Sequence, residues 1–309
     1  MKKPLITTIA FIFLFAALAN AQDPDFQSGL QQFNAKQFEA AAETFRQITI
    51  RQPNNKAAHY NRGMSLFNLR RYADALPSFQ MAAELDTTDS KPYEYIGRCC
   101  ILLKRYADAA AAFRSQIAIV PNDFNGNYFL GYSLYEAKNY TEAERYTKEA
   151  IRLKPNDAPA RTNLGKILNA QKRYQESITP LTEAVRLDPK IADAHFGLGN
   201  SFYNRGLYAE SVPHYAKAAE LLPNSALAFA YLGDAYLNTR QNEKAIETYK
   251  KSIALDAKEV VAQMGLGLAY INLKNFAGVR TQIAVLQVLD PAKAKELEDK
   301  AIKAGMPRQ

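Results

Sequence analysis

Glycines at an unbroken 34-residue spacing constrain the fold of this 309-residue chain more than any other feature. A period of about 20 to 50 residues is typical of repeat architectures, in which each unit buries its apolar face against its neighbours. The series therefore predicts eight stacked units rather than one globular core. Its members are Gly29, Gly63, Gly97, Gly131, Gly165, Gly199, Gly233 and Gly267.

Companion residues at fixed distances from each glycine predict that every unit is a pair of helices. Glycine inside a helix costs about 1 kcal/mol relative to alanine, so another interaction must offset that cost. The residue twelve positions after the glycine is short, which predicts two helices in close approach through facing small side chains. An aromatic residue recurs nine positions after the glycine, and proline ends most units. The small residues are Ala41, Ala75, Ala109, Ala143, Ser177, Ser211, Ala245 and Val279.

These positions resemble the pattern of the tetratricopeptide repeat (TPR) family. The sixth unit carries the pattern as Leu198, Gly199, Phe202, Tyr208, Ser211, Tyr215, Ala218 and Pro223. The resemblance implies an all-α fold, a right-handed α-solenoid of eight 34-residue helical hairpins whose first helices line a concave groove. Amphipathic residues near the C-terminus predict a capping helix and tail over 294–309. The expected repeats are 22–55, 56–89, 90–123, 124–157, 158–191, 192–225, 226–259 and 260–293.

Residues 1–21 resemble a bacterial secretory signal peptide. Two lysines precede an apolar stretch over 5–18, and small residues stand at 19 and 21. A helix needs roughly 20 apolar residues to span a bilayer, so we predict cleavage between Ala21 and Gln22, with an uncleaved anchor as the alternative. Cleavage predicts a periplasmic or secreted protein with no transmembrane segment after signal removal.

The composition argues against catalysis. Three histidines and two cysteines give little material for a metal centre or a disulfide scaffold, and no cluster has the spacing of metal ligands. The adjacent Cys99 and Cys100 occupy apolar positions of the repeat, which predicts core packing, and His59 and His195 occupy a slot that is aromatic in the family. We therefore predict a non-enzymatic protein without a cofactor.

The resemblance assigns fixed first-helix positions to the groove wall, and these hold aromatic and amide side chains. Rings bury apolar anchors and amides satisfy backbone groups, a combination that suits a peptide or protein partner. Each ring has an alternative role, packing against the adjacent repeat. Tyr128, Tyr132 and Tyr135 share one helical face, on which we centre the predicted site, with Arg98 and Lys166 nearby. The predicted site comprises Tyr60, Phe67, Arg98, Tyr128, Tyr132, Tyr135, Asn163, Lys166, Asn169, Phe196, Asn200 and Tyr203.

Charge narrows the class of partner. The formal net charge is +8, but acidic side chains outnumber basic ones at the groove positions, which argues against nucleic acid along the groove. Some TPR domains hold a peptide's C-terminal carboxylate with five polar residues; of these only Asn61 and Lys91 match, which argues against that mode. The groove charges are Lys91, Arg98 and Lys166 against Asp23, Glu94, Glu136, Asp193 and Asp234.

A basic residue stands seven positions after seven of the eight glycines. Positive charge near a helix C-terminus complements the helix dipole; contact with an anionic envelope surface is the alternative. Our functional prediction is an exported scaffold that binds a peptide or protein surface. The alternatives are a regulatory or substrate-recruiting arm of an enzyme complex, and an envelope-surface binder that uses this row. The row is Lys36, Arg70, Lys104, Lys138, Lys172, Arg240 and Lys274, interrupted by Gly206.

Overall fold

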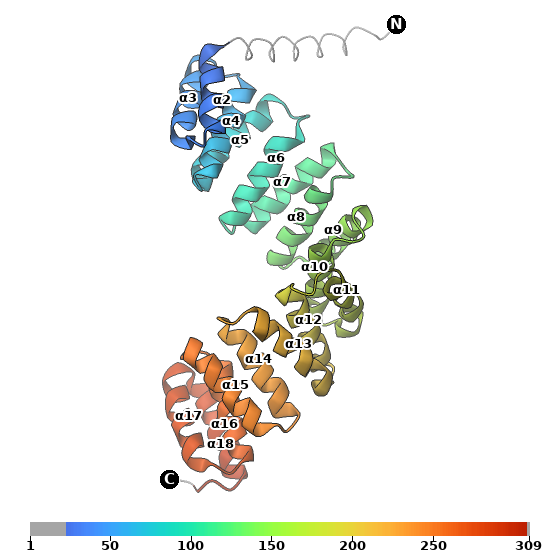
Figure 1. The fold of residues 1–309 in the computed structure, drawn as a ribbon, viewed down its shortest axis with the longest axis vertical. Coiled ribbons are helices and arrows are strands. Elements are labelled where there is room, and N and C mark those ends of the chain that lie inside the picture. Colours follow the sequence, from blue (N-terminus) through green and yellow to red (C-terminus); the bar gives the residue numbers. More distant parts are fainter. Residues whose placement is uncertain (1–22, 308–309) are drawn as a thin grey trace. The chain divides into compact units, whose positions relative to one another are not determined.

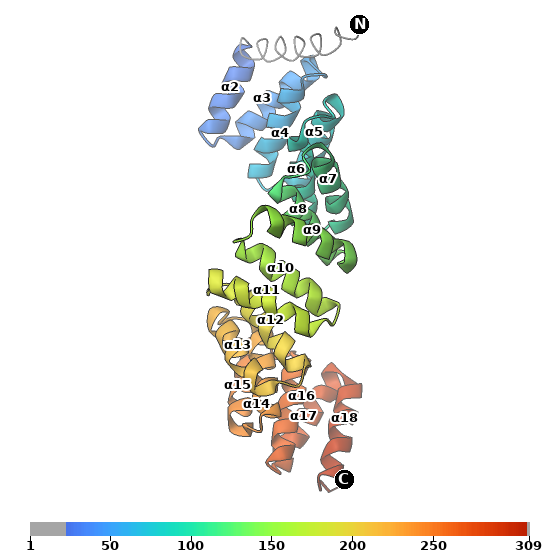
Figure 2. The same cartoon turned by 90° about the vertical axis from the view of Figure 1, so that its right-hand side faces the viewer.

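The computed structural model describes residues 23–307, and these form 17 α-helices and no strand (Figure 1). The predicted cleavage site at Ala21 and Gln22 lies outside the described residues. Two compact units divide the chain, Met1–Leu153 and Lys154–Gln309. Within each unit consecutive helices pack against one another as hairpins, which confirms the predicted all-α solenoid class (Figure 2).

Each hairpin consists of a first helix of 11 to 13 residues and a second helix of 14 residues. From the second repeat onward, first helices begin 34 residues apart, which confirms the period. The first helices are α2 (Pro24–Asn34), α4 (Lys56–Asn68), α6 (Ser90–Leu102), α8 (Phe124–Glu136), α10 (Ala158–Ala170), α12 (Ala192–Asn204), α14 (Ala226–Asn238) and α16 (Val260–Asn272). The second helices are α3 (Phe38–Arg51), α5 (Tyr72–Leu85), α7 (Tyr106–Ile119), α9 (Tyr140–Leu153), α11 (Tyr174–Leu187), α13 (Tyr208–Leu221), α15 (Asn242–Leu255) and α17 (Phe276–Leu289).

A last helix, α18 (Pro291–Lys303), packs on α16 and α17 and closes the C-terminal end of the second unit. It begins three residues before the predicted cap, because Asp290 accepts hydrogen bonds from the backbone amides of Ala292 and Lys293. Leu297 is fully buried against the last hairpin, so the helix supplies the cover that a following repeat would give.

The partner of the repeat glycine differs from the prediction. The short residues twelve positions later are all fully buried, as expected. In most repeats, however, the space beside the glycine is filled by a large side chain sixteen positions later. A Cβ on Gly97 would lie 2.5 Å from the Phe113 ring. Only Gly131 faces a close helix backbone, with the carbonyl oxygen of Ala143 3.3 Å from a built Cβ. The prediction of small facing small was therefore wrong for most repeats: glycine makes room for a ring.

The residues of the basic row share one backbone conformation. Each of its members adopts a left-handed conformation, with φ between 53° and 62°, and Gly206 does so at 76°. In the third repeat the Lys104 amide donates to the carbonyl of Ile101 and the Arg105 amide to that of Cys100, the pairing of a helix C-terminal cap. A left-handed non-glycine residue costs about 1 to 2 kcal/mol. The positions at helix ends agree with the dipole interpretation, and contact with an anionic envelope surface stays a prediction.

Candidate functional site

First helices of neighbouring repeats contact one another in both units: α6 contacts α8, α10 contacts α12, and α14 contacts α16. Side chains that project from them therefore share a surface within each unit. We call this the first-helix surface. It carries the residues predicted to bind a partner, and the two units are considered one at a time.

In the first unit, an aromatic cluster joins the second and third repeats. The ring of Tyr95 lies 5.8 Å from that of Tyr60, 5.5 Å from that of Phe67 and 5.2 Å from that of Phe79, centroid to centroid. Tyr60 and Phe67 thus pack against the adjacent repeat, the alternative that the sequence left open. Both residues remain half-buried, so part of each is still accessible to solvent. Burial raises the pKa of the Tyr60 hydroxyl, which stays protonated and able to donate.

Arg98 lies at the next repeat boundary, between the rings of Tyr95 and Phe129. Its guanidinium carbon is 5.7 Å from the first ring centroid and 5.3 Å from the second, within the range of cation–π attraction. A terminal nitrogen pairs with Glu94 at 2.8 Å. The Nε atom is buried without a hydrogen-bond partner among the described residues. Arg98 is therefore held in place as part of the surface.

The three tyrosines on α8, at which the predicted site is centred, are all half-buried. Each contacts a different ring, so none is a free-standing side chain. The three lie on one helix, α8; that they share a face and bind a partner stays a prediction. Tyr128 stacks on Phe124 at 5.8 Å, Tyr132 lies 6.5 Å from Tyr106, and Tyr135 lies 5.9 Å from Tyr140.

In the second unit, several predicted polar residues connect repeats to each other. Lys166 Nζ pairs with Asp193 at 2.9 Å. The Asn169 amide donates to the carbonyl of Gly197 at 2.9 Å, and its oxygen accepts from Ser201 at 3.0 Å. Asn163 is only 5% exposed, so it contributes little to the surface. These contacts join the fifth and sixth repeats, a role that the sequence prediction did not include.

Two tyrosines of second helices reach across their hairpins to the residue that follows the repeat glycine. Tyr215 donates to the Asn200 side chain at 2.6 Å, and Tyr249 donates to the Asp234 carboxylate at 2.5 Å. Both rings are fully buried. In the first three repeats the same buried slot holds phenylalanine, and the residue after the glycine is Leu30, Met64 or Arg98. Where tyrosine replaces phenylalanine in this slot, the residue after the glycine is an amide or an acid, and this pairing in the sequence could have predicted the hydrogen bond.

Aromatic rings surround this part of the second unit. The Phe196 ring lies 5.2 Å from that of Tyr231, and Tyr231 stacks on Tyr215 at 5.7 Å. Tyr203 lies 6.3 Å from Tyr215, and its hydroxyl accepts from the Asn238 amide at 2.9 Å. The sequence prediction included Phe196, Asn200 and Tyr203 but missed Tyr231.

Asp234 has an unusual environment for a carboxylate. Burial raises its pKa to about 6, an effect that the Tyr249 hydrogen bond opposes and nearby Glu259 reinforces. The same carboxylate raises the pKa of the hydroxyl of Tyr231, in addition to the effect of burial. Asp234 is therefore ionised at neutral pH only at a free-energy cost.

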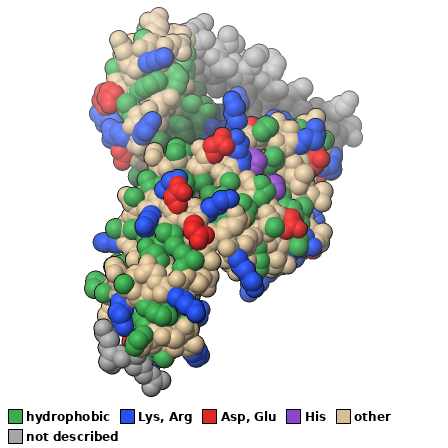
Figure 3. All heavy atoms as spheres, turned by 60° about the horizontal axis from the view of Figure 1, so that its bottom comes forward, with side chains coloured by type: hydrophobic (Ala, Val, Ile, Leu, Met, Phe, Trp, Pro, Cys, Tyr) green, Lys and Arg blue, Asp and Glu red, His purple; other side chains and the backbone are tan. Residues whose placement is uncertain are grey.

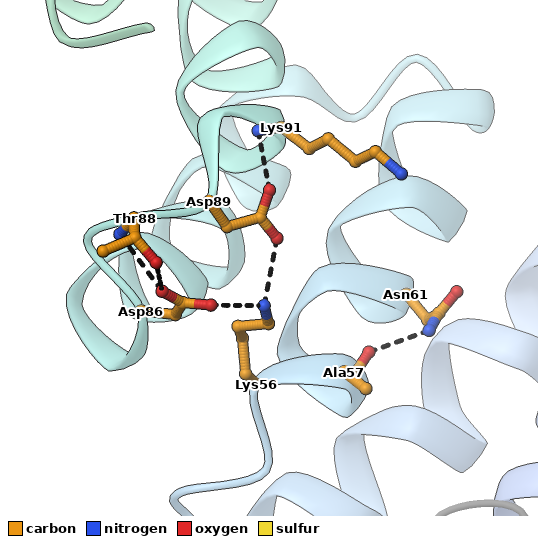
Figure 4. Close-up of polar contacts among 7 residues, drawn as sticks. All are labelled: Lys56, Ala57, Asn61, Asp86, Thr88, Asp89 and Lys91. Carbon is orange, nitrogen blue, oxygen red and sulfur yellow. Dashed lines mark hydrogen bonds and ion pairs between the residues drawn. The ribbon is translucent and has the colours of Figure 1, made fainter. Parts of the chain in front are cut away.

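Figure 4 shows Asn61 and Lys91, the two residues that match the carboxylate-binding pattern of some TPR domains. The Asn61 amide donates to the carbonyl of Ala57 within its own helix at 2.8 Å. Lys56, at the start of the same repeat, instead pairs with the turn that ends this repeat, at 2.8 Å to Asp86 and 3.0 Å to Asp89. The Lys91 side chain points away from Asp89. Asn61 and Lys91 thus do not converge with further polar residues on one position.

Residues in the slot four positions before the glycine support the turns. In five repeats a polar side chain there contacts the carbonyl six residues earlier. His59 and His195 thus each contact the turn that precedes their own helix. The contacts are His59 to Pro53 at 2.8 Å, Asn127 to Pro121 at 3.0 Å, Arg161 to Pro155 at 2.9 Å, His195 to Pro189 at 3.1 Å and Gln263 to Ala257 at 2.9 Å.

The cysteines are buried and unbonded to each other, as predicted. Burial raises the pKa of the Cys99 thiol to about 12 and also raises that of Cys100, so both remain uncharged thiols. Within residues 23–307 no group of three or more His, Cys, Asp and Glu side chains is arranged to hold a metal ion. No helix in that part of the chain has the length and apolar character needed to cross a membrane.

Charges of both signs are interspersed with hydrophobic side chains on the face shown in Figure 3.

Models of the tetratricopeptide repeat match residues 26–90, 124–157, 192–225 and 228–259, and a TPR repeat model matches 165–206. The chain is a tetratricopeptide repeat protein. A comparison with curated proteins finds no match.

Solved TPR structures share the fold at low sequence identity. The C-terminal part of a TPR repeat-containing protein from Cytophaga hutchinsonii is 19% identical, with a TM-score of 0.61, over 78% of this chain and 98% of that one. A tetratricopeptide repeat protein from Parabacteroides merdae is 17% identical, with a TM-score of 0.58, over 79% and 97%. Pseudomonas aeruginosa pilF is 17% identical, with a TM-score of 0.60, over 68% and 97%. These likenesses establish the fold.

Proposed function

We propose that this TPR protein is an exported, non-enzymatic scaffold that binds a peptide segment or protein surface on its first-helix surface. The observation that carries this proposal is the row of half-buried rings on that surface. Aromatic side chains that are fixed by neighbours, yet keep an accessible edge, lose little entropy on binding and are typical interface anchors. A role as an arm of an enzyme complex uses the same surface and remains the alternative.

The first unit offers the clearest test, at Tyr132 and Tyr135 on α8. We expect a photo-crosslinking amino acid at either position to give adducts with a discrete polypeptide in cells of the native host. Ala111 on α7 is exposed on a second helix and serves as the matched control. Adducts from Ala111 identical to those from α8 would contradict binding on the first-helix surface.

Alanine substitution of Tyr128, Tyr132 and Tyr135 together should weaken binding of the crosslinked partner at least tenfold. Truncating a central aromatic anchor typically costs about 2 kcal/mol or more. Because these rings also contact neighbouring side chains, circular dichroism must show that the variant retains its helices. A helical variant with unchanged affinity would remove these tyrosines from the binding site.

The export part of the proposal rests on the leader-like residues at 1–21. Mass spectrometry of the protein purified from its native host should give an N-terminus at Gln22. A chain that begins at Met1 would contradict export by a cleaved signal, and it would leave the binding proposal intact.

A further inference from the structure

The second unit carries a carboxylate on its first-helix surface, that of Asp234, which forms no ion pair with a basic side chain of residues 23–307. The acidic and basic residues at the fifth and sixth repeats, Lys166 and Asp193, neutralise each other at 2.9 Å. Within the described part of the chain, the Asp234 carboxylate, one repeat further along, accepts a hydrogen bond from the Tyr249 hydroxyl and from no other group. The charged residue that acts on it electrostatically is Glu259, which is also acidic. The ionised Asp234 side chain therefore has a neighbouring acid and a hydroxyl donor, but no counter-charge among the described residues.

The groups around this carboxylate are those that bind organic cations in proteins. Asn238 connects Tyr203 to Asp234, because its amide donates to the Tyr203 hydroxyl at 2.9 Å and to the backbone carbonyl of Asp234 at 2.8 Å. Tyr231 lies on the same helix as Asp234, which raises the pKa of both tyrosine hydroxyls, and both rings are half-buried. Aromatic rings attract ammonium and guanidinium groups through their quadrupoles, most strongly where water is partly excluded. Asn238 is exposed at the edge and fixes the Tyr203 hydroxyl at 2.9 Å.

We propose that Asp234, Tyr203 and Tyr231 form the recognition site for a lysine or arginine side chain of a bound protein segment. This inference rests on the proposed function and specifies the chemistry of the partner at the second unit. Charge complementarity selects this occupant, because a cation would pair with the carboxylate oxygen that Tyr249 does not occupy. A neutral side chain would leave the ionised carboxylate without a counter-charge.

The buried Tyr249 side chain holds the Asp234 carboxylate in position through a hydrogen bond. Its ring is fully buried, and its hydroxyl donates to the Asp234 Oδ1 atom at 2.5 Å. A carboxylate that is fixed before binding loses no further rotamer entropy when the cation arrives. The site is thus built on two helices, α12 and α14, with support from α15.

The test uses the full chain and degenerate nonapeptide pools that differ only at a fixed central residue. One pool has arginine there, a second has citrulline, which has nearly the same shape without the charge, and a third has glutamate. At pH 7.5 we expect the wild-type chain to retain the arginine pool at least tenfold more than the citrulline pool. Asp234→Asn should reduce that ratio to about one, because the amide preserves the shape and removes the charge.

Glu220→Gln on the second helix α13 is the matched control, since it removes an exposed carboxylate that Lys217 already neutralises. It should leave the arginine preference unchanged. A wild-type chain without arginine preference, or an Asp234→Asn variant that keeps it, would overturn the inference. Equal retention of all three pools would contradict the cation site but not the proposed peptide binding. If the chain retained none of the pools, both the cation site and the proposed peptide binding would be contradicted.

Acidification provides a second readout. The groups that face Asp234 are Tyr203, Tyr231 and Tyr249, which stay protonated, and Glu259 at the start of α16. Since the pKa of Asp234 is raised to about 6, lowering the pH from 7.5 to 5 should remove most of the arginine preference. Glu259→Gln separates any contribution of the second acid. A preference that is constant from pH 7.5 to 5 in the wild-type chain would assign it to another group.

Discussion

Gly265→Ala is expected to destabilise the end of the second unit by about 2 to 4 kcal/mol, although alanine is the better helix former. A Cβ at position 265 would lie 2.2 Å from the Cζ atom of Tyr249 and 2.4 Å from its hydroxyl oxygen. That ring is fully buried and tied to Asp234, so it cannot rotate away cheaply. Relief requires α15 and α16 to separate or the hydrogen bond to break, which would leave a partly buried carboxylate unpaired.

Gly267→Ala is the matched control on the same helix. Its Cβ would meet Leu297 at 2.4 Å, which is also a close contact, but the leucine side chain is flexible and makes no hydrogen bond. We expect a smaller loss, of about 1 kcal/mol, because leucine can change rotamer. Hydrogen exchange across α14 to α16 measures the local effect, since repeat stacks unfold in sections. Equal protection in the two variants would contradict the assignment of Tyr249 as the rigid partner.

The glycine example shows what a repeat period can and cannot predict. The spacing of 34 residues correctly predicted the hairpins, their order and the burial of small residues such as Ala41 and Ala109. It did not predict which side chain fills the space beside each glycine, because that depends on how two helices cross. The ring of Phe113, sixteen residues after Gly97, fills it in the third repeat.

In the candidate site, too, the sequence predicted the position of residues but not their contacts. First-helix spacing correctly placed Phe196 and Tyr203 on α12, which contacts the first helix of the preceding repeat. It could not tell that Asn169 would be used within the chain, because its partner in the next repeat is the backbone of Gly197. The repeat period assigns a residue to a face of its helix. Hydrogen bonds to the adjacent repeat then decide whether its side chain is available to bind a partner.

The buried carboxylate leads to a second large effect. Asp234→Asn should stabilise the second unit at pH 7.5, by up to about 3 kcal/mol, with partial solvent access reducing the gain. The pKa of Asp234 is raised from 3.8 to about 6 in the folded chain. Folding therefore favours the protonated acid, and the stability that protonation confers is fully present below pH 3.8 and is lost as the pH rises through about 6. Asparagine keeps an oxygen acceptor for the Tyr249 hydroxyl and never acquires the charge.

The pH profile distinguishes this mechanism from a simple improvement in packing. The difference in unfolding free energy between Asp234→Asn and the wild type should be small below pH 4, grow between pH 4 and 6, and level off above pH 7. Asp193→Asn, at an exposed ion pair with Lys166, should show no such rise, so the comparison isolates burial from loss of an acid. A gain that is the same at pH 4 and pH 7.5 would mean that Asp234 is not strained by ionisation. If the gain instead follows the predicted profile, the chain retains at Asp234 a charge that weakens its own fold, as expected where a charged partner group supplies the missing cation on binding.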